Sequence, residues 1–140
     1  MTDLQGALGL SQLERLDEFV ERRNQLAQAY DKLLAQSPIQ RPTILEGNYS
    51  SFHLYVIRLN TRNQPKIHKR IFKGLRKAGI GVNLHYMPVH LQPYFRRCGF
   101  EEGYCPESEA YGREAISLPL YPSITDLQQK RVVKFLKNMI

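Results

Sequence analysis

Hydrogen-bonding rings gather in one short stretch of the sequence, at His85, Tyr86, His90 and Tyr94. Imidazole and phenol groups donate and accept hydrogen bonds, and imidazole also takes up a proton near neutral pH. Strand ends and the loops that follow them are where binding sites tend to be built. The stretch is therefore the candidate binding site, although Tyr86 and Tyr94 also fit a simpler role as packing residues with a wet hydroxyl group.

The residues before these rings predict how they are positioned. Gly79 is typical of a residue that closes a helix, and residues 80–85 then alternate between apolar and small or polar side chains. This alternation predicts a strand that ends at His85. Pro88 has no N–H to donate to a sheet, so we expect His90 to Tyr94 to lie in a turn that doubles back.

The rest of the chain predicts helices interleaved with strands. Thr2 with Gln5 and Thr125 with Gln128 have the spacing of a capping box, which marks a helix start. The same spacing at Ser11 predicts one long helix over residues 11–36. Further helices are expected from Asn63 through residue 78 and over residues 106–115, and strands over residues 52–59 and 116–121.

These elements predict an α+β domain with a small three-stranded sheet covered on one face by helices. The strand over residues 52–59 is apolar on both faces and is expected at the centre of the sheet. His53 in this strand is interpreted as a core or supporting histidine, because a buried imidazole usually finds a hydrogen-bond partner.

Composition favours an anionic partner. The 140 residues carry a formal net charge of +7, with 20 Lys and Arg against 13 Asp and Glu. No apolar run approaches the roughly 20 residues of a membrane span, and the start of the chain has no secretory pattern, so a cytoplasmic location is expected.

Nucleic acid is not expected as a partner, because the basic face of the helix over residues 66–77 has no exposed aromatic side chains on which bases could stack. No metal site is expected from Cys98, Cys105 and the histidines.

The motifs together resemble the C-terminal domain of the DegT/DnrJ/StrS family, the pyridoxal-phosphate sugar-nucleotide aminotransferases. The resemblance rests on residues 79–95, on SFHLYVI at 51–57, on SLPLYP at 117–122, and on the opening residues 1–13. It implies the small C-terminal domain of the aspartate-aminotransferase-like (fold type I) transferases. Residues 1–36 would be a helical connector to a missing large domain, and residues 37–140 the small domain.

The resemblance also implies a function for the parent protein. It would convert a keto-sugar nucleotide into an amino-sugar nucleotide, using an amino-acid donor, for cell-surface or spore-coat polysaccharide biosynthesis. The parent would be a homodimer with bound pyridoxal 5'-phosphate. No cofactor is expected on this chain alone, because each of its eight lysines falls on a helix in charged company, which leaves the Schiff-base lysine to the missing domain. The eight lysines are Lys32, Lys66, Lys69, Lys73, Lys77, Lys130, Lys134 and Lys137.

By resemblance, His90 and Tyr94 contact the substrate and His85 lies near the cofactor, with Tyr86 as a further substrate-binding candidate. No catalytic residue is assigned to this chain. Arg96 and Arg97 are candidates to face the diphosphate on charge alone. The alternatives are a stand-alone binding module for an anionic ligand, which would need no missing domain, and a structural piece that associates through the apolar segment between Leu4 and Leu16.

Overall fold

The computed structural model describes residues 1–60 and 65–140. The helices are α1 (Asp3–Leu13), α2 (Leu16–Leu33), α3 (Pro65–Lys77), α4 (Pro93–Arg97), α5 (Pro106–Glu114) and α6 (Asp126–Lys137), with a 3-10 helix η1 (Val89–Leu91). The strands are β1 (Ile39–Gln40), β2 (Tyr55–Leu59) and β3 (Ala115–Leu118). The predicted helix start at Asn63 lies outside the described residues.

The strands form one antiparallel sheet in the order β1-β2-β3. Ile39 pairs with Leu59 at one side of β2, and Ile57 pairs with Ile116 at the other. The α+β class and the small three-stranded sheet are thus confirmed, as is the central place of β2. β1 was not predicted, because its pairing is only two residues long.

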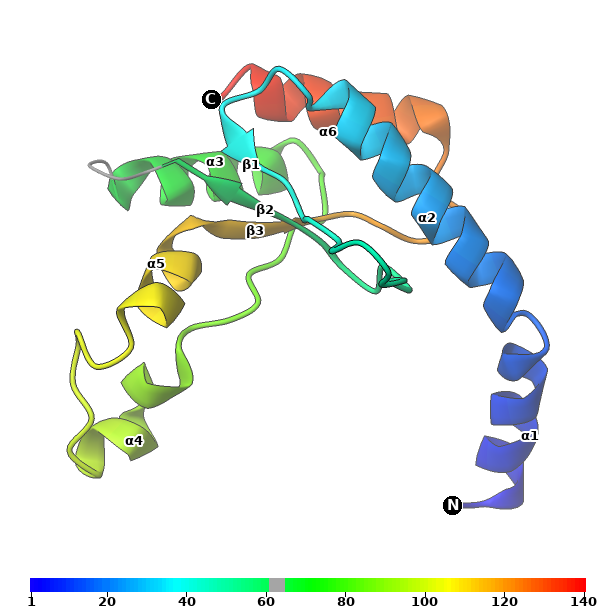
Figure 1. Ribbon diagram of the computed structural model, residues 1–140, viewed down its shortest axis with the longest axis horizontal. Coiled ribbons are helices and arrows are strands. Elements are labelled where there is room, and N and C mark those ends of the chain that lie inside the picture. Colours follow the sequence, from blue (N-terminus) through cyan, green and yellow to red (C-terminus); the bar gives the residue numbers. More distant parts are fainter. Residues whose placement is uncertain (61–64) are drawn as a thin grey trace.

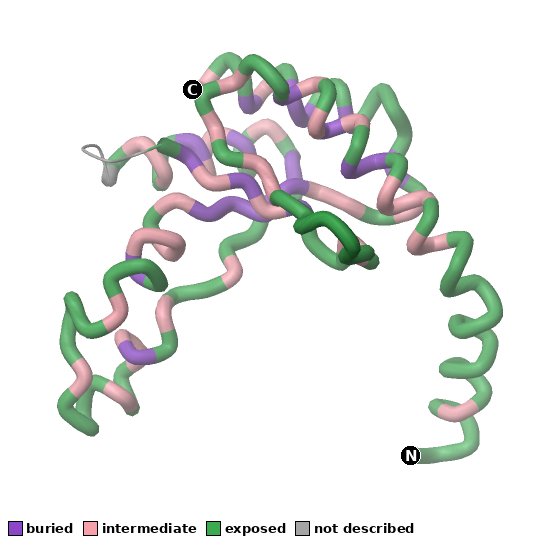
Figure 2. The backbone as a smooth tube through the Cα atoms, in the orientation of Figure 1, coloured by how far each residue is buried: buried purple, intermediate pink, exposed green. Residues whose placement is uncertain are grey.

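One face of the sheet carries the core. Alternate residues of β2, Tyr55, Ile57 and Leu59, are buried and belong to a single cluster with side chains of α2, α3 and α6. Figure 2 shows the buried residues concentrated in the sheet and in the helices that face it. Tyr30 of α2 stacks on Tyr55 with ring centroids 4.9 Å apart, and neither ring is exposed. Burial of this apolar surface is the main term that stabilises the domain.

The N-terminal helices differ from the prediction. The capping box of Thr2 is confirmed, since its N–H donates to Gln5 Oε1 at 2.8 Å and its Oγ1 accepts from Gln5 N at 3.3 Å. The helix that begins there runs through Ser11, so Ser11 is not an N-cap and the single helix over residues 11–36 was wrong. The chain bends at Arg15 (φ −106°, ψ 7°), and α1 projects beyond the end of α2, away from the sheet (Figure 1).

The predicted strand over residues 80–85 was also wrong. Ile80 and Val82 are buried in the core, as the alternation indicated, but the segment meets the sheet only at a single bridge between Asn83 and Ser117. Both backbone bonds of this bridge are present, at 2.8 and 3.2 Å. Beyond it the chain leaves β3, and Leu84 is exposed. The burial pattern was therefore right, whereas the pairing was not.

The interpretation of His53 as a core or supporting histidine of a buried strand was wrong. β2 begins at Tyr55, and His53 is exposed. The chain just before it is held by side chains of α2 in place of a sheet partner, because Arg23 donates to Ser51 O at 2.9 Å and Asn24 donates to Ser50 O at 3.0 Å.

Within the described residues, no helix has both the length and the apolar character needed to cross a membrane.

Candidate functional site

The predicted rings lie in residues 85–94, which we name the His85–Tyr94 segment. The segment follows the bridge between Asn83 and β3, passes through η1 and ends in the first turn of α4. Pro88 immediately precedes η1, and Pro93 is the first residue of α4, which fits the preference of proline for a first helical turn. The expected turn after Pro88 is therefore a short 3-10 helix.

His85 is anchored to the sheet. Its Nδ1 lies 2.7 Å from Oγ of Ser117, a buried residue of β3. Tyr86 packs edge-on against the His85 ring with centroids 4.7 Å apart, yet 73% of Tyr86 is exposed. The sheet thus fixes the imidazole, and the phenol beside it stands open to a ligand or to another polypeptide.

His85 and Tyr86 line a cavity of about 620 Å3 between α3, α5 and the His85–Tyr94 segment. Apolar side chains form much of its wall, among them Phe72, Leu84, Met87 and Leu91. Lys69, Lys73 and Arg113 also line it, together with Glu102 and Glu109. Arg113 lies 3.6 Å from a carboxylate oxygen of each glutamate, which leaves the two lysines as the source of positive charge in the wall. The sequence had suggested only a solvated basic helix face for the two lysines. Their spacing of one helical turn beside an apolar Phe72 is the signal that would have indicated a shared lining.

His90 occupies a different environment, because it is buried against Glu109 of α5. Its Nε2 lies 2.8 Å from Glu109 Oε1, and the same oxygen accepts a hydrogen bond from Gly103 N at 2.8 Å. The two residues are 8% and 4% exposed. The bond from His90 holds the pKa of Glu109 below its usual range, against the opposing effect of burial and with help from the Gly103 N–H. Sequence reasoning had noted Glu109 only as a first-turn acidic residue.

Tyr94 lies apart from the cavity. It is 63% exposed, in α4, and contacts Phe95 edge-on with centroids 5.3 Å apart. Arg96 and Arg97 are exposed in the last turn of the same helix. Of the predicted site residues, the structure thus brings His85 and Tyr86 together. His90 is buried against α5, and Tyr94 lies on a separate surface.

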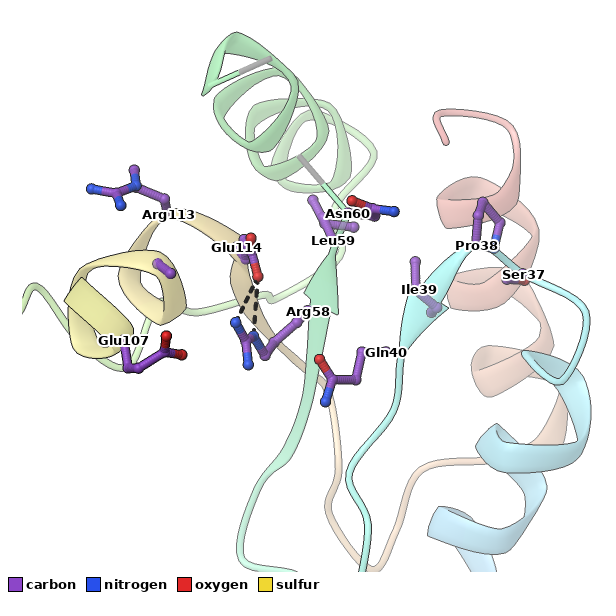
Figure 3. Close-up of a pocket in the computed structure, with 11 residues that line it drawn as sticks. Ser37, Pro38, Ile39, Gln40, Arg58, Leu59, Asn60, Glu107, Arg113 and Glu114 are labelled. Carbon is purple, nitrogen blue, oxygen red and sulfur yellow. Dashed lines mark hydrogen bonds and ion pairs between the residues drawn. The ribbon is translucent and has the colours of Figure 1, made fainter. Parts of the chain in front are cut away.

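A second cavity, of about 800 Å3, lies between α5 and the β1–β2 side of the sheet (Figure 3). Arg58 reaches into it from β2 and donates from Nε and Nη2 to Glu114 Oε2 at 3.1 and 2.8 Å. Gln40 of β1 points toward the same pair (Figure 3). Because the charges of Arg58 and Glu114 compensate each other, this cavity has no marked preference for an anion.

Pyridoxal phosphate needs a lysine that forms a Schiff base with it, and the chain carries eight lysines. All eight lysines are exposed and lie on helices, and none is buried in a way that would favour its neutral, nucleophilic form. The described residues of this chain therefore do not fit a complete cofactor site.

Comparison with known proteins gives a consistent picture. The model of the DegT/DnrJ/EryC1/StrS aminotransferase family matches residues 1–137. The chain is 32% identical over 143 residues to the spore coat polysaccharide biosynthesis protein SpsC of Bacillus subtilis strain 168, a match that covers all of the chain and 37% of that protein. It is 33% identical over 138 residues to a pleiotropic regulatory protein of Geobacillus stearothermophilus, covering 96% of the chain and 36% of that protein.

Solved structures agree with these relatives. Spr1654 from Streptococcus pneumoniae, described as a sugar aminotransferase and solved in apo, PMP and PLP forms, has a TM-score of 0.94 and 31% identity over 99% of the chain. Helicobacter pylori PseC, described as an aminotransferase of pseudoaminic acid biosynthesis, has a TM-score of 0.90 and 25% identity. The chain spans only 35% and 37% of these two proteins. Since the family match extends over nearly the whole sequence and the fold agrees, the chain belongs to the DegT/DnrJ/EryC1/StrS aminotransferase family.

Proposed function

We propose that this chain is the C-terminal part of a longer aminotransferase that converts a keto-sugar nucleotide into an amino-sugar nucleotide. The observation that carries the proposal is the family match over residues 1–137 combined with a span of only 37% of SpsC. Residues 37–140 would form the small domain, and residues 1–36 would connect it to the rest of the protein. The name of SpsC favours a role in spore-coat or other cell-surface polysaccharide synthesis.

In this proposal the chain contributes substrate recognition. Tyr86 at the 620 Å3 cavity and Tyr94 on a separate surface are both largely exposed, and their hydroxyl groups would hydrogen-bond a sugar nucleotide. His85, held by Ser117, would lie nearest the reacting group. Substrate contact by His90 stays a prediction. Its burial against Glu109 favours a role in holding the segment over a direct contact.

Lys69 and Lys73 are also proposed to interact with the diphosphate of the substrate. They line the same cavity as His85, whereas Arg96 and Arg97 do not. Lysine ammonium groups in the lining of a largely apolar cavity suit a ligand that joins phosphates to less polar groups.

The PLP and PMP forms of Spr1654 favour pyridoxal phosphate as the cofactor of the longer protein. When bound, it would carry the amino group from the amino-acid donor to the sugar carbonyl. The exposed lysines of this chain favour a Schiff-base lysine elsewhere in the protein. A cytoplasmic homodimer, as in the resembling family, completes the proposal.

The alternative is a stand-alone binding module for an anionic ligand. The net charge of +7 and the lysines of the 620 Å3 cavity favour it. This alternative requires the 140-residue chain to bind its ligand alone, whereas the aminotransferase proposal does not.

Activity assays separate the two. A longer protein that contains this chain, purified with pyridoxal phosphate, should transfer the amino group of an amino acid to a nucleotide-linked keto-sugar. The 140-residue chain alone should show no aldimine absorbance and no adduct after borohydride reduction and peptide mapping. A stoichiometric adduct on one lysine of the chain alone would contradict the proposal. So would tight binding of a nucleoside diphosphate by the chain together with no transfer by the longer protein.

A further inference from the structure

We propose that Glu109 is a positioning residue that locks the His85–Tyr94 segment onto α5 and so fixes how its tyrosines are presented. The contacts that hold the segment are seen in the structure of this chain. The further statement that the rings of Tyr86 and Tyr94 contact a sugar nucleotide rests on the proposed function.

The first contact is a buried carboxylate shared by two separate parts of the chain. Glu109 Oε1 accepts from His90 Nε2 and from Gly103 N, both at 2.8 Å, and its side chain is 3% exposed. Oε2 lies 3.6 Å from the exposed Arg113 guanidinium. One carboxylate therefore joins η1 to the loop that precedes α5.

A second contact lies one helical turn further along α5. A Cβ atom at Gly112 would stand 2.9 Å from Cδ of Pro88 and 3.5 Å from the carbonyl oxygen of Tyr86. Only glycine allows the segment to come this close to the helix. Glu109 and Gly112 are three positions apart and so share a helix face, which means that this face holds Pro88 and His90 together.

The two contacts hold the middle of the segment on α5 and leave the tyrosine on either side exposed. Pro88 packs on Gly112 and His90 is buried against Glu109, whereas Tyr86 and Tyr94 on either side are 73% and 63% exposed. A ring on a fixed backbone loses less freedom when it binds a ligand than a ring on a mobile loop. The held middle therefore sets the positions of the exposed tyrosines.

The chemistry of the pair fits positioning better than simple stabilisation. A hydrogen bond between two buried side chains adds only modest net stability, but removal of one partner leaves the other unsatisfied, at a larger cost. A carboxylate that accepts from both a ring and a backbone N–H also fixes direction, which an apolar contact does not.

Backbone NMR of the 140-residue chain tests the proposal. In Glu109→Ala, the amide resonances of residues 85–94 should change their chemical shifts, and the order parameters of these amides should fall from about 0.85 to below about 0.6. Glu109→Gln should show the same changes more weakly. The amides of β2, β3 and α2 should stay unchanged. Glu107→Gln is the matched control, because Glu107 is an exposed acid in the same first turn of α5, and it should leave the segment unchanged.

The reciprocal variant His90→Asn provides a second readout. It should reproduce the changes in residues 85–94, and the double variant with Glu109→Ala should add little to either single one. In His90→Asn, the Glu109 carboxyl carbon should titrate closer to the ordinary glutamate pKa of about 4.3.

An unchanged segment in Glu109→Ala would overturn the proposal. Equal disturbance of β2, β3 and the segment would also overturn it, since it would mean that Glu109 merely supports the fold. None of these readouts needs a substrate or a cofactor, so a failure of the proposed enzymatic function is distinguishable from a failure of this inference.

Discussion

The Nε2 atom of His90 and the Oε1 atom of Glu109 lie 2.8 Å apart, with both side chains buried. This pair joins η1 to α5 across 19 residues of sequence. Arg113 on α5 lies 3.6 Å from Glu109 and 3.6 Å from Glu102, and Lys69 and Lys73 line the same cavity as Glu109. Because the pair lowers the pKa of Glu109, the free energy of unfolding should depend on pH.

Glu109 should make the chain more sensitive to acid. Its pKa is lower in the folded chain than its ordinary value of about 4.3, so its contribution is complete above that value and is lost as the pH falls through the folded pKa. Urea unfolding between about pH 5 and about pH 2 should show a steeper loss of free energy for the wild type than for Glu109→Gln. Parallel curves for the two proteins would contradict this expectation.

Gly112→Ala should destabilise the chain. The new Cβ would lie 2.9 Å from Cδ of Pro88, whose ring is rigid, and such overpacking costs roughly 1 to 3 kcal/mol, more than the gain in helix propensity of up to about 1 kcal/mol. Gly9→Ala is the control, because nothing lies within 4 Å of the added Cβ in α1. Urea unfolding should separate the two variants, and a Gly112→Ala protein as stable as the wild type would disprove the close contact.

Tyr30→Phe should weaken the core without a change of shape. The buried hydroxyl donates to Pro119 O at 2.9 Å, and its loss leaves that carbonyl without this partner, at a cost of about 1 to 3 kcal/mol. Tyr121→Phe, at an exposed tyrosine, should change the free energy of unfolding by less than about 0.5 kcal/mol. Equal stabilities for both variants would show that the buried bond contributes nothing.

The surface of α1 should make the isolated chain associate. No residue of this helix is buried, and Leu4, Leu8 and Leu13 are 81%, 62% and 63% exposed. Apolar patches of this kind favour contact with another surface. Light scattering should show mass rising with concentration, and Leu4→Gln with Leu8→Gln should reduce it without changing the free energy of unfolding. A monomer at high concentration that binds no hydrophobic dye would argue against this expectation.

Capping-box sequences predicted helix starts correctly where no earlier helix already ran through them. Thr2 and Thr125 both form the capping boxes that their spacing indicated. The same spacing at Ser11 failed because α1 had already begun at Asp3 and runs through it. A capping box shows where a helix is able to start, and the chain before it decides whether one starts there.

Pairing and buried charge depended on distant parts of the chain. The alternation at Ile80 and Val82 correctly indicated burial, but Asn83 pairs with β3 only once, and β1 takes the other side of β2. Glu109 reads as an ordinary acid of a first helical turn. Its partner His90 lies beyond a loop whose path no local pattern specifies, so its burial was not predictable from the sequence.

Steady-state kinetics of Tyr94→Phe in the longer protein that contains this chain would test the central claim most directly. If the chain supplies sugar-nucleotide recognition, loss of the exposed Tyr94 hydroxyl should weaken substrate binding and turnover by roughly 1 to 3 kcal/mol, while the absorbance of the cofactor stays unchanged. His85→Ala should reduce turnover with a smaller effect on sugar affinity. Unchanged affinity and turnover in both variants would contradict the substrate-binding role of the His85–Tyr94 segment.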